Sequence, residues 1–96
     1  MFDNVLGFLG ILFRANKALI GEEARSSKKG KLAFLASDAS ENTKKETKTL
    51  TDVLPTLTTY TKSQLGSALG YEGISFILIV DKKAANSLLK KRKETL

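Results

Sequence analysis

The feature that most constrains the fold is an uninterrupted apolar run towards the C-terminal end of the chain. Residues 74–80 read Ile-Ser-Phe-Ile-Leu-Ile-Val, with Ser75 as the only polar side chain. A run of this length fits a β-strand and is far too short to cross a bilayer. Its continuous Ile, Phe, Leu and Val side chains favour burial on both faces, as in the central strand of a sheet. We therefore expect a sheet that helices cover on both sides.

Two helices are predicted ahead of the first buried strand. Apolar residues in the N-terminal segment recur at helical spacing, which predicts a helix that fades near Asn16: Phe2, Val5, Leu6, Leu9, Leu12 and Phe13. Ile20-Gly21 reads as a turn. Acidic residues then open a short helix from Glu22 to Lys29, for which Gly30 is the expected C-terminal cap.

The rest of the chain alternates between strands and helices. Strands are predicted over residues 32–36 and 57–61, on either side of a helix that starts after Ser40 and stops before Pro55. A helix over residues 64–69 follows, with Ser63 as its N-cap and Gly70 as its C-terminal cap. Asp81 is expected to cap the last helix, whose apolar stripe consists of Ala84, Ala85, Leu88 and Leu89.

This order of elements predicts the fold class. Strands that alternate with helices favour the α/β class, here a three-layer α/β/α sandwich with a small mixed sheet. The chain of 96 residues is the size of one domain, so residues 1–96 are predicted to form a single domain.

The charge of the chain points to polyanionic partners. Sixteen Lys and Arg face ten Asp and Glu, for a formal net charge of +6. A basic balance favours nucleic acid ahead of a surface that is basic only for solubility. The chain has no Cys and no His, which excludes disulfides and thiolate sites and removes the commonest general base. The lack of Cys and of a targeting segment fits a cytoplasmic protein, and no membrane partner is expected.

The lysines gather in three clusters. The first consists of Lys28, Lys29 and Lys31, the second of Lys44, Lys45 and Lys48, and the third of Lys82, Lys83 and residues 90–93. Each fits contacts with phosphates or a solvated surface, and for the third cluster alone the solvated surface is favoured. Since Tyr60 and Tyr71 are the only polar aromatic residues, docking on a shaped RNA is favoured over stacking along a single strand.

The sequence carries no recognisable catalytic motif. Asp3, Glu22, Glu23, Asp38 and Glu41 could supply a carboxylate pair, but acidic residues in first helical turns have a structural reason to be there. No Gly-rich loop follows a strand in the way that a phosphate-binding motif requires. We therefore expect that the protein is not an enzyme and that it binds no cofactor, no metal and no small-molecule substrate.

Several blocks of the chain resemble the ribosomal protein L-seven-Ae family of kink-turn RNA-binding proteins, most of all its small bacterial YlxQ-like branch. The similarity runs from Ala15-Asn16-Lys17 through Ile20-Gly21-Glu22-Glu23 and the block over residues 31–45. It continues with Pro55, with Ser63-Gln64-Leu65-Gly66-Ser67-Ala68-Leu69-Gly70 and with residues 74–81. The family fold that this similarity implies agrees with the order of elements predicted above.

The resemblance also implies which residues contact RNA. Members of the family place a Gly and an acidic or amide residue at the start of the second helix against sheared G·A pairs, which corresponds here to Gly21, Glu22 and Glu23. Where the family often has Asn or Lys before the Glu, this chain has Glu22. The loop after the Leu-Gly helix also contacts RNA in the family, and expected phosphate contacts complete the predicted interface: Tyr71, Glu72, Gly73 and Ile74, with Arg25, Lys28 and Lys31.

The sequence therefore predicts a non-catalytic module that recognises structured, kink-turn-like RNA and is associated with the ribosome or with translation. One alternative is a protein-interaction module of translation or transcription whose basic surface is nonspecific. A second alternative, an enzyme acting on RNA or nucleotides, would need a carboxylate cluster such as one around Asp38 and Glu41.

Overall fold

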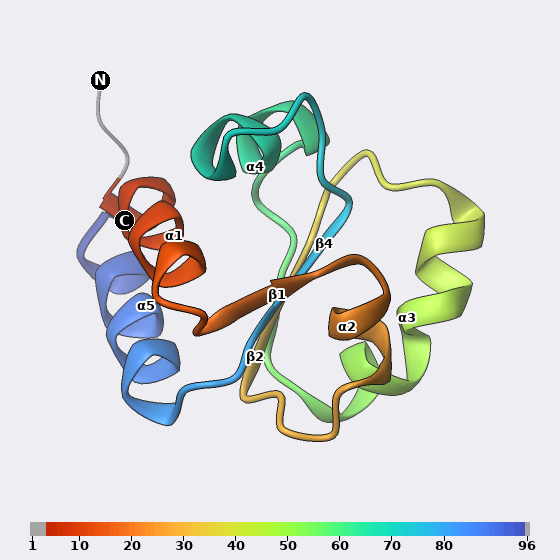
Figure 1. The fold of residues 1–96 in the computed structure, drawn as a ribbon, viewed down its shortest axis with the longest axis horizontal. Coiled ribbons are helices and arrows are strands. Elements are labelled where there is room, and N and C mark those ends of the chain that lie inside the picture. The colour runs from red at the N-terminus through yellow and green to blue at the C-terminus, as the bar shows by residue number, and fades with distance from the viewer. Residues whose placement is uncertain (1–3, 96) are drawn as a thin grey trace.

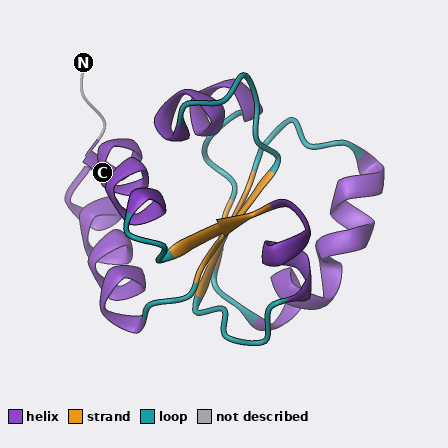
Figure 2. Ribbon diagram, viewed as in Figure 1, coloured by secondary structure: helices purple, strands orange, loops and turns teal. Residues whose placement is uncertain are grey.

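The computed structural model describes the backbone of residues 4–95 and the side chains of residues 4–90. Helices and strands alternate over most of this length (Figures 1 and 2). In chain order they are α1 (Asn4–Arg14), β1 (Ala18–Ile20), α2 (Gly21–Ser26), β2 (Leu32–Leu35), α3 (Glu41–Val53), β3 (Thr56–Leu57), α4 (Lys62–Leu69), β4 (Phe76–Ile79) and α5 (Lys82–Thr95).

The sheet is mixed, and β4 lies inside it as the apolar run predicts. The strand order is β1-β4-β2-β3, with β4 antiparallel to both of its neighbours and β2 parallel to β3. All four residues of β4 are buried. Ile79 is the partner of Ala18 on one side and of Leu32 on the other, so that β1 and β2 are in step across β4.

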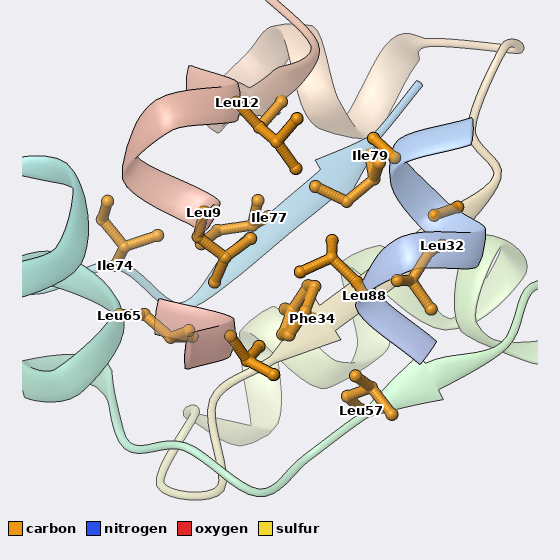
Figure 3. Close-up of a cluster of buried hydrophobic side chains, with 14 of the residues drawn as sticks. Leu9, Leu12, Leu32, Phe34, Leu57, Leu65, Ile74, Ile77, Ile79 and Leu88 are labelled. Carbon is orange, nitrogen blue, oxygen red and sulfur yellow. The ribbon is translucent and has the colours of Figure 1, made fainter. Parts of the chain in front are cut away.

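Helices cover both faces of the sheet and form the three layers expected from the sequence (Figure 1). On one face, α1, α4 and α5 pack on the larger core; Figure 3 shows Leu9 and Leu12 of α1 with Ile77 and Ile79, and Leu88 beside Phe34. On the other face, α2 and α3 cover a smaller core: Ala24, Ala33, Phe76 and Leu78, with Leu50 and Leu54 packed against them. The alternation of strand side chains between two apolar layers explains the continuous hydrophobicity of β4.

Several helix ends are formed by the residues that the sequence indicates. Ser40 caps α3, with its side chain accepting a hydrogen bond from the Thr43 amide. At the start of α5, Asp81 Oδ2 accepts from the Ala84 amide at 2.9 Å. Gly70 ends α4 in the left-handed conformation, at φ 86°. The expected caps Ser40, Asp81 and Gly70 are therefore confirmed.

The segment around the second helix differs from its prediction in two ways. Residues Ala18–Ile20 form strand β1, although only a turn was expected at Ile20. Three residues are too few to show a periodicity, and their pairing with β4 makes them a strand. The helix also ends at Ser26, with Ser27 as C-cap, so the predictions that it reaches Lys29 and that Gly30 caps it are wrong. Gly30 packs against the core instead, since a Cβ there would lie 2.6 Å from Leu78 Cδ1.

Two further predictions are corrected next to α4. Its N-cap is Thr61, in a reciprocal capping box with Gln64, and Ser63 lies inside the helix. The Thr-x-x-Gln spacing was the sequence signal for this cap. The predicted strand over residues 57–61 reduces to Thr56–Leu57 because only these residues pair with β2.

Candidate nucleic-acid interface

Strand pairing brings together the two main segments of the predicted interface. In the antiparallel register Ile20 faces Ile77, which sets Gly21 level with Phe76. The loop over residues 71–74 enters β4 just before that point. In Figure 1, β1 runs into α2 beside the place where the loop from α4 reaches β4. Gly21, Glu22 and Glu23 thus share one end of the sheet with residues 71–74.

Gly21 has a backbone conformation that explains its residue type. Its φ is +64°, in the left-handed region, where a side chain strains the backbone. No atom lies within 4 Å of the position a Cβ would take, so the residue opens to solvent. The chain can therefore turn sharply from β1 into α2 and leave its backbone accessible to a close ligand.

Glu22 and Glu23 are exposed in the first turn of α2, where the helix dipole favours carboxylates. The backbone of α2 is fixed by Ala24, which is fully buried under the sheet, and by the Ser26 hydroxyl, which donates to the Glu22 carbonyl at 2.9 Å. The two carboxylates are consequently presented to solvent from a short but anchored helix.

The loop over residues 71–74 is held tightly against α4. The Tyr71 amide donates to the Gly66 carbonyl at 2.8 Å, and the Ile74 amide donates to the Lys62 carbonyl at 3.1 Å. A Cβ on Gly66 would lie 2.7 Å from the Gly73 nitrogen, so the loop approaches α4 more closely than any side chain would permit. These contacts fix the loop against α4.

The predicted contacts in this loop are not equally accessible. Tyr71 is 49% exposed and packs edge-on against Phe13, with ring centroids 5.9 Å apart. Glu72 and Gly73 are exposed. Ile74, in contrast, is 7% exposed and belongs to the larger core. Ile74 is therefore a core residue, and the predicted contacts of this loop that reach solvent are Tyr71, Glu72 and Gly73.

Asp38 anchors the same end of the sheet, a role that the sequence did not reveal. Its Oδ1 accepts a hydrogen bond from the Lys62 amide at 2.8 Å and so joins the turn after β2 to the start of α4. Glu41, the other carboxylate considered for catalysis, lies 3.5 Å from Lys44 Nζ in an exposed ion pair. Both groups thus have structural partners.

The cations expected to hold phosphates do not lie at one place in the structure. Arg25 forms a 2.9 Å ion pair with Glu46 of α3. The Lys31 amide donates to the Ile79 carbonyl, which places Lys31 at the opposite end of the strands, roughly 13 Å along β4 from Gly21. Lys28 lies in the segment that leads to Lys31. Of these three cations, Arg25 is paired with a carboxylate and Lys31 lies away from Gly21.

Comparison with known proteins supports the fold. No protein-family model and no curated protein matches the chain. Among solved structures, a protein of unknown function from Bacillus halodurans C is similar, with a TM-score of 0.78 and 26% identity over 96% of this chain and 99% of that one. In the part of the chain that the structure describes, no helix is long and apolar enough to cross a membrane.

Proposed function

We propose that this protein is a non-catalytic RNA-binding module that recognises structured, kink-turn-like RNA in a ribosomal or translational setting. The observation that carries the proposal is the adjacency of Gly21, Glu22 and Glu23 to the loop over residues 71–74, set by the Ile20–Ile77 pairing. The resemblance to the L-seven-Ae family implies RNA contacts for these same two segments.

The chemistry of this end of the sheet suits base edges better than phosphates. A carboxylate accepts hydrogen bonds, and guanine offers N–H donors when its edge is exposed in a bulged or kinked helix. A phosphate at hydrogen-bonding distance would instead be repelled by the negative charges of Glu22, Glu23 and Glu72. Gly21 allows the RNA to approach the backbone closely because it has no side chain.

The alternative is a protein-interaction module in translation or transcription. It is favoured by the exposed carboxylates of Glu22, Glu23 and Glu72, because acidic residues also suit a basic protein partner. The two functions differ in what the removal of one carboxylate should do to RNA selectivity.

The test compares Glu23→Ala with Glu41→Ala, two variants that lose one exposed carboxylate each. Binding is titrated with a kink-turn RNA and with the same RNA after replacement of its G·A pairs. Loss of one base-reading group should reduce the preference for the intact RNA by about 5- to 150-fold. Glu41→Ala should leave that preference unchanged. Equal behaviour of the two variants would favour the protein-interaction module.

A further inference from the structure

The end of the sheet opposite Gly21 gathers lysines from three separate segments. The Val80 amide donates to the Lys17 carbonyl at 3.0 Å, and the Lys31 amide donates to the Ile79 carbonyl at 2.7 Å. Lys17 and Lys31 therefore flank the end of β4, on strands spaced about 4.8 Å on each side. The segments that meet here lie together at the lower left of the sheet in Figure 1. We call this surface the basic edge, and it consists of Lys17, Lys28, Lys29, Lys31, Lys82 and Lys83.

These side chains are free to meet an external anion. All six are exposed. The salt bridges within the described part of the chain involve other residues: Arg25–Glu46, Lys44–Glu41 and Lys48–Asp52. The acidic residue closest in sequence is Asp81, whose Oδ2 already accepts from the Ala84 amide. The basic edge is therefore a region of concentrated positive charge, which attracts polyanions.

Two of the lysines occupy positions that do not favour a cation. Lys82 and Lys83 form the first turn of α5, a helix with no acidic residue in that turn. The positive end of the helix dipole lies there and adds to the positive potential of the surface. If the basic edge served only solubility, its cations would not have to lie in the first turn of a helix.

We propose that the basic edge binds the phosphate backbone of an RNA duplex as a second surface, separate from the end that carries Gly21. RNA is favoured over an anionic membrane because the three segments carry no exposed large apolar side chain; such side chains are Ile11, Val53 and Tyr71 in the described residues. The basic edge binds without reading sequence, because lysines on phosphates position an RNA and do not specify it. This role does not depend on base reading by Glu22 and Glu23.

The experiment compares two triple variants that remove the same number of charges. Lys17→Gln/Lys31→Gln/Lys83→Gln alters the basic edge, and Lys44→Gln/Lys45→Gln/Lys48→Gln alters exposed lysines of α3. Both are titrated with a plain RNA duplex and with intact and G·A-replaced kink-turn RNAs over a series of salt concentrations. Thermal unfolding of each variant verifies that it is folded.

We expect the plot of the logarithm of the binding constant against the logarithm of the salt concentration to become shallower for the basic-edge variant. The slope should decrease in magnitude by about 0.9 for each phosphate contact removed, on every RNA. The α3 variant should keep the slope of the unaltered protein. Equal slopes for the two variants, or binding to anionic lipid vesicles without binding to RNA, would overturn the proposal. If base reading failed, the unaltered protein would bind intact and G·A-replaced RNAs equally. The basic-edge variant would still show a weaker salt dependence than the unaltered protein.

Discussion

The two ends of β4 differ in charge although the strand is only four residues long. At its N-terminal end, β4 lies level with Gly21, and the adjoining segments carry the exposed residues Glu22, Glu23 and Glu72. At its C-terminal end, Lys17 and Lys31 flank it on both sides. This difference is the basis of our proposal that one end reads bases and the other binds phosphates. Base contacts give selectivity, and phosphate contacts give affinity and orientation.

The ion pair between Arg25 and Glu46 sharpens this contrast. Arg25 is the cation of the predicted interface that lies on α2 itself, and Glu46 holds it at 2.9 Å. An exposed pair of this kind adds little stability, but it reduces the positive charge available beside Glu22 and Glu23. We therefore expect the affinity for RNA to depend on the basic edge far more than on Arg25.

The largest effect on the N-terminal end of β4 is expected from Gly66→Ala. Its Cβ would be 2.7 Å from both the Gly73 nitrogen and the Tyr71 carbonyl oxygen, so the loop over residues 71–74 has to move. Overpacking of this kind should lower the free energy of unfolding by about 1–3 kcal/mol. The preference for intact kink-turn RNA should fall, whereas the salt slope should not change.

Gly7→Ala is the matched control for that variant, because nothing lies within 4 Å of its added Cβ. It removes a glycine from a helix and should raise stability by about 1 kcal/mol. Urea unfolding of both variants measures the difference. Equal stabilities would show that the loop is not held by its close approach to α4.

A smaller effect is expected from Gly21→Ala, which adds a side chain at φ +64° without any steric neighbour. The left-handed conformation should cost about 1–2 kcal/mol of folding stability, and Gly21→Asn should cost less because Asn tolerates that conformation better. Thermal unfolding of the pair measures the backbone contribution. If Ala and Asn were equally destabilising, φ would not be the reason for glycine at this position.

The smallest expected effect on stability comes from the other end of β4 and has the opposite sign. Lys82→Glu/Lys83→Glu places carboxylates in the first turn of α5 and should raise the free energy of unfolding by about 0.3–1 kcal/mol per residue at low salt. Binding to an RNA duplex should weaken at the same time. Lys90→Glu, farther along α5, should give no gain in stability. A double variant that lost stability would contradict the role assigned to the helix dipole.

The elements predictable from sequence are those whose signals are local. The apolar run of β4 and the caps Ser40 and Asp81 each depend on a few adjacent residues, and each is confirmed. Strand β1 is three residues long and exists because it pairs with β4, which no local pattern records. Gly30 was predicted to cap a helix, because its packing against Leu78 arises only in the folded core and leaves no local sequence signal.

The candidate interface divides in the same way. Gly21, Glu22 and Glu23 are contiguous, and the resemblance to a known family was enough to single them out. The basic edge joins Lys17, Lys31 and Lys83, which are far apart in sequence. Sequence clusters placed Lys31 with Lys28 and with the Gly21 end, whereas strand register sets it beside Val80 at the opposite end. Long-range pairing was the missing information.

The most direct test is a titration of the unaltered protein with a labelled kink-turn RNA and with the same RNA after replacement of its G·A pairs, at two salt concentrations. If the two ends of β4 divide base reading from phosphate binding, both affinities should fall with salt while the intact RNA stays preferred, and at the higher salt only the intact RNA should remain bound. Equal binding of the two RNAs, fading together with salt, would contradict base reading by Glu22 and Glu23.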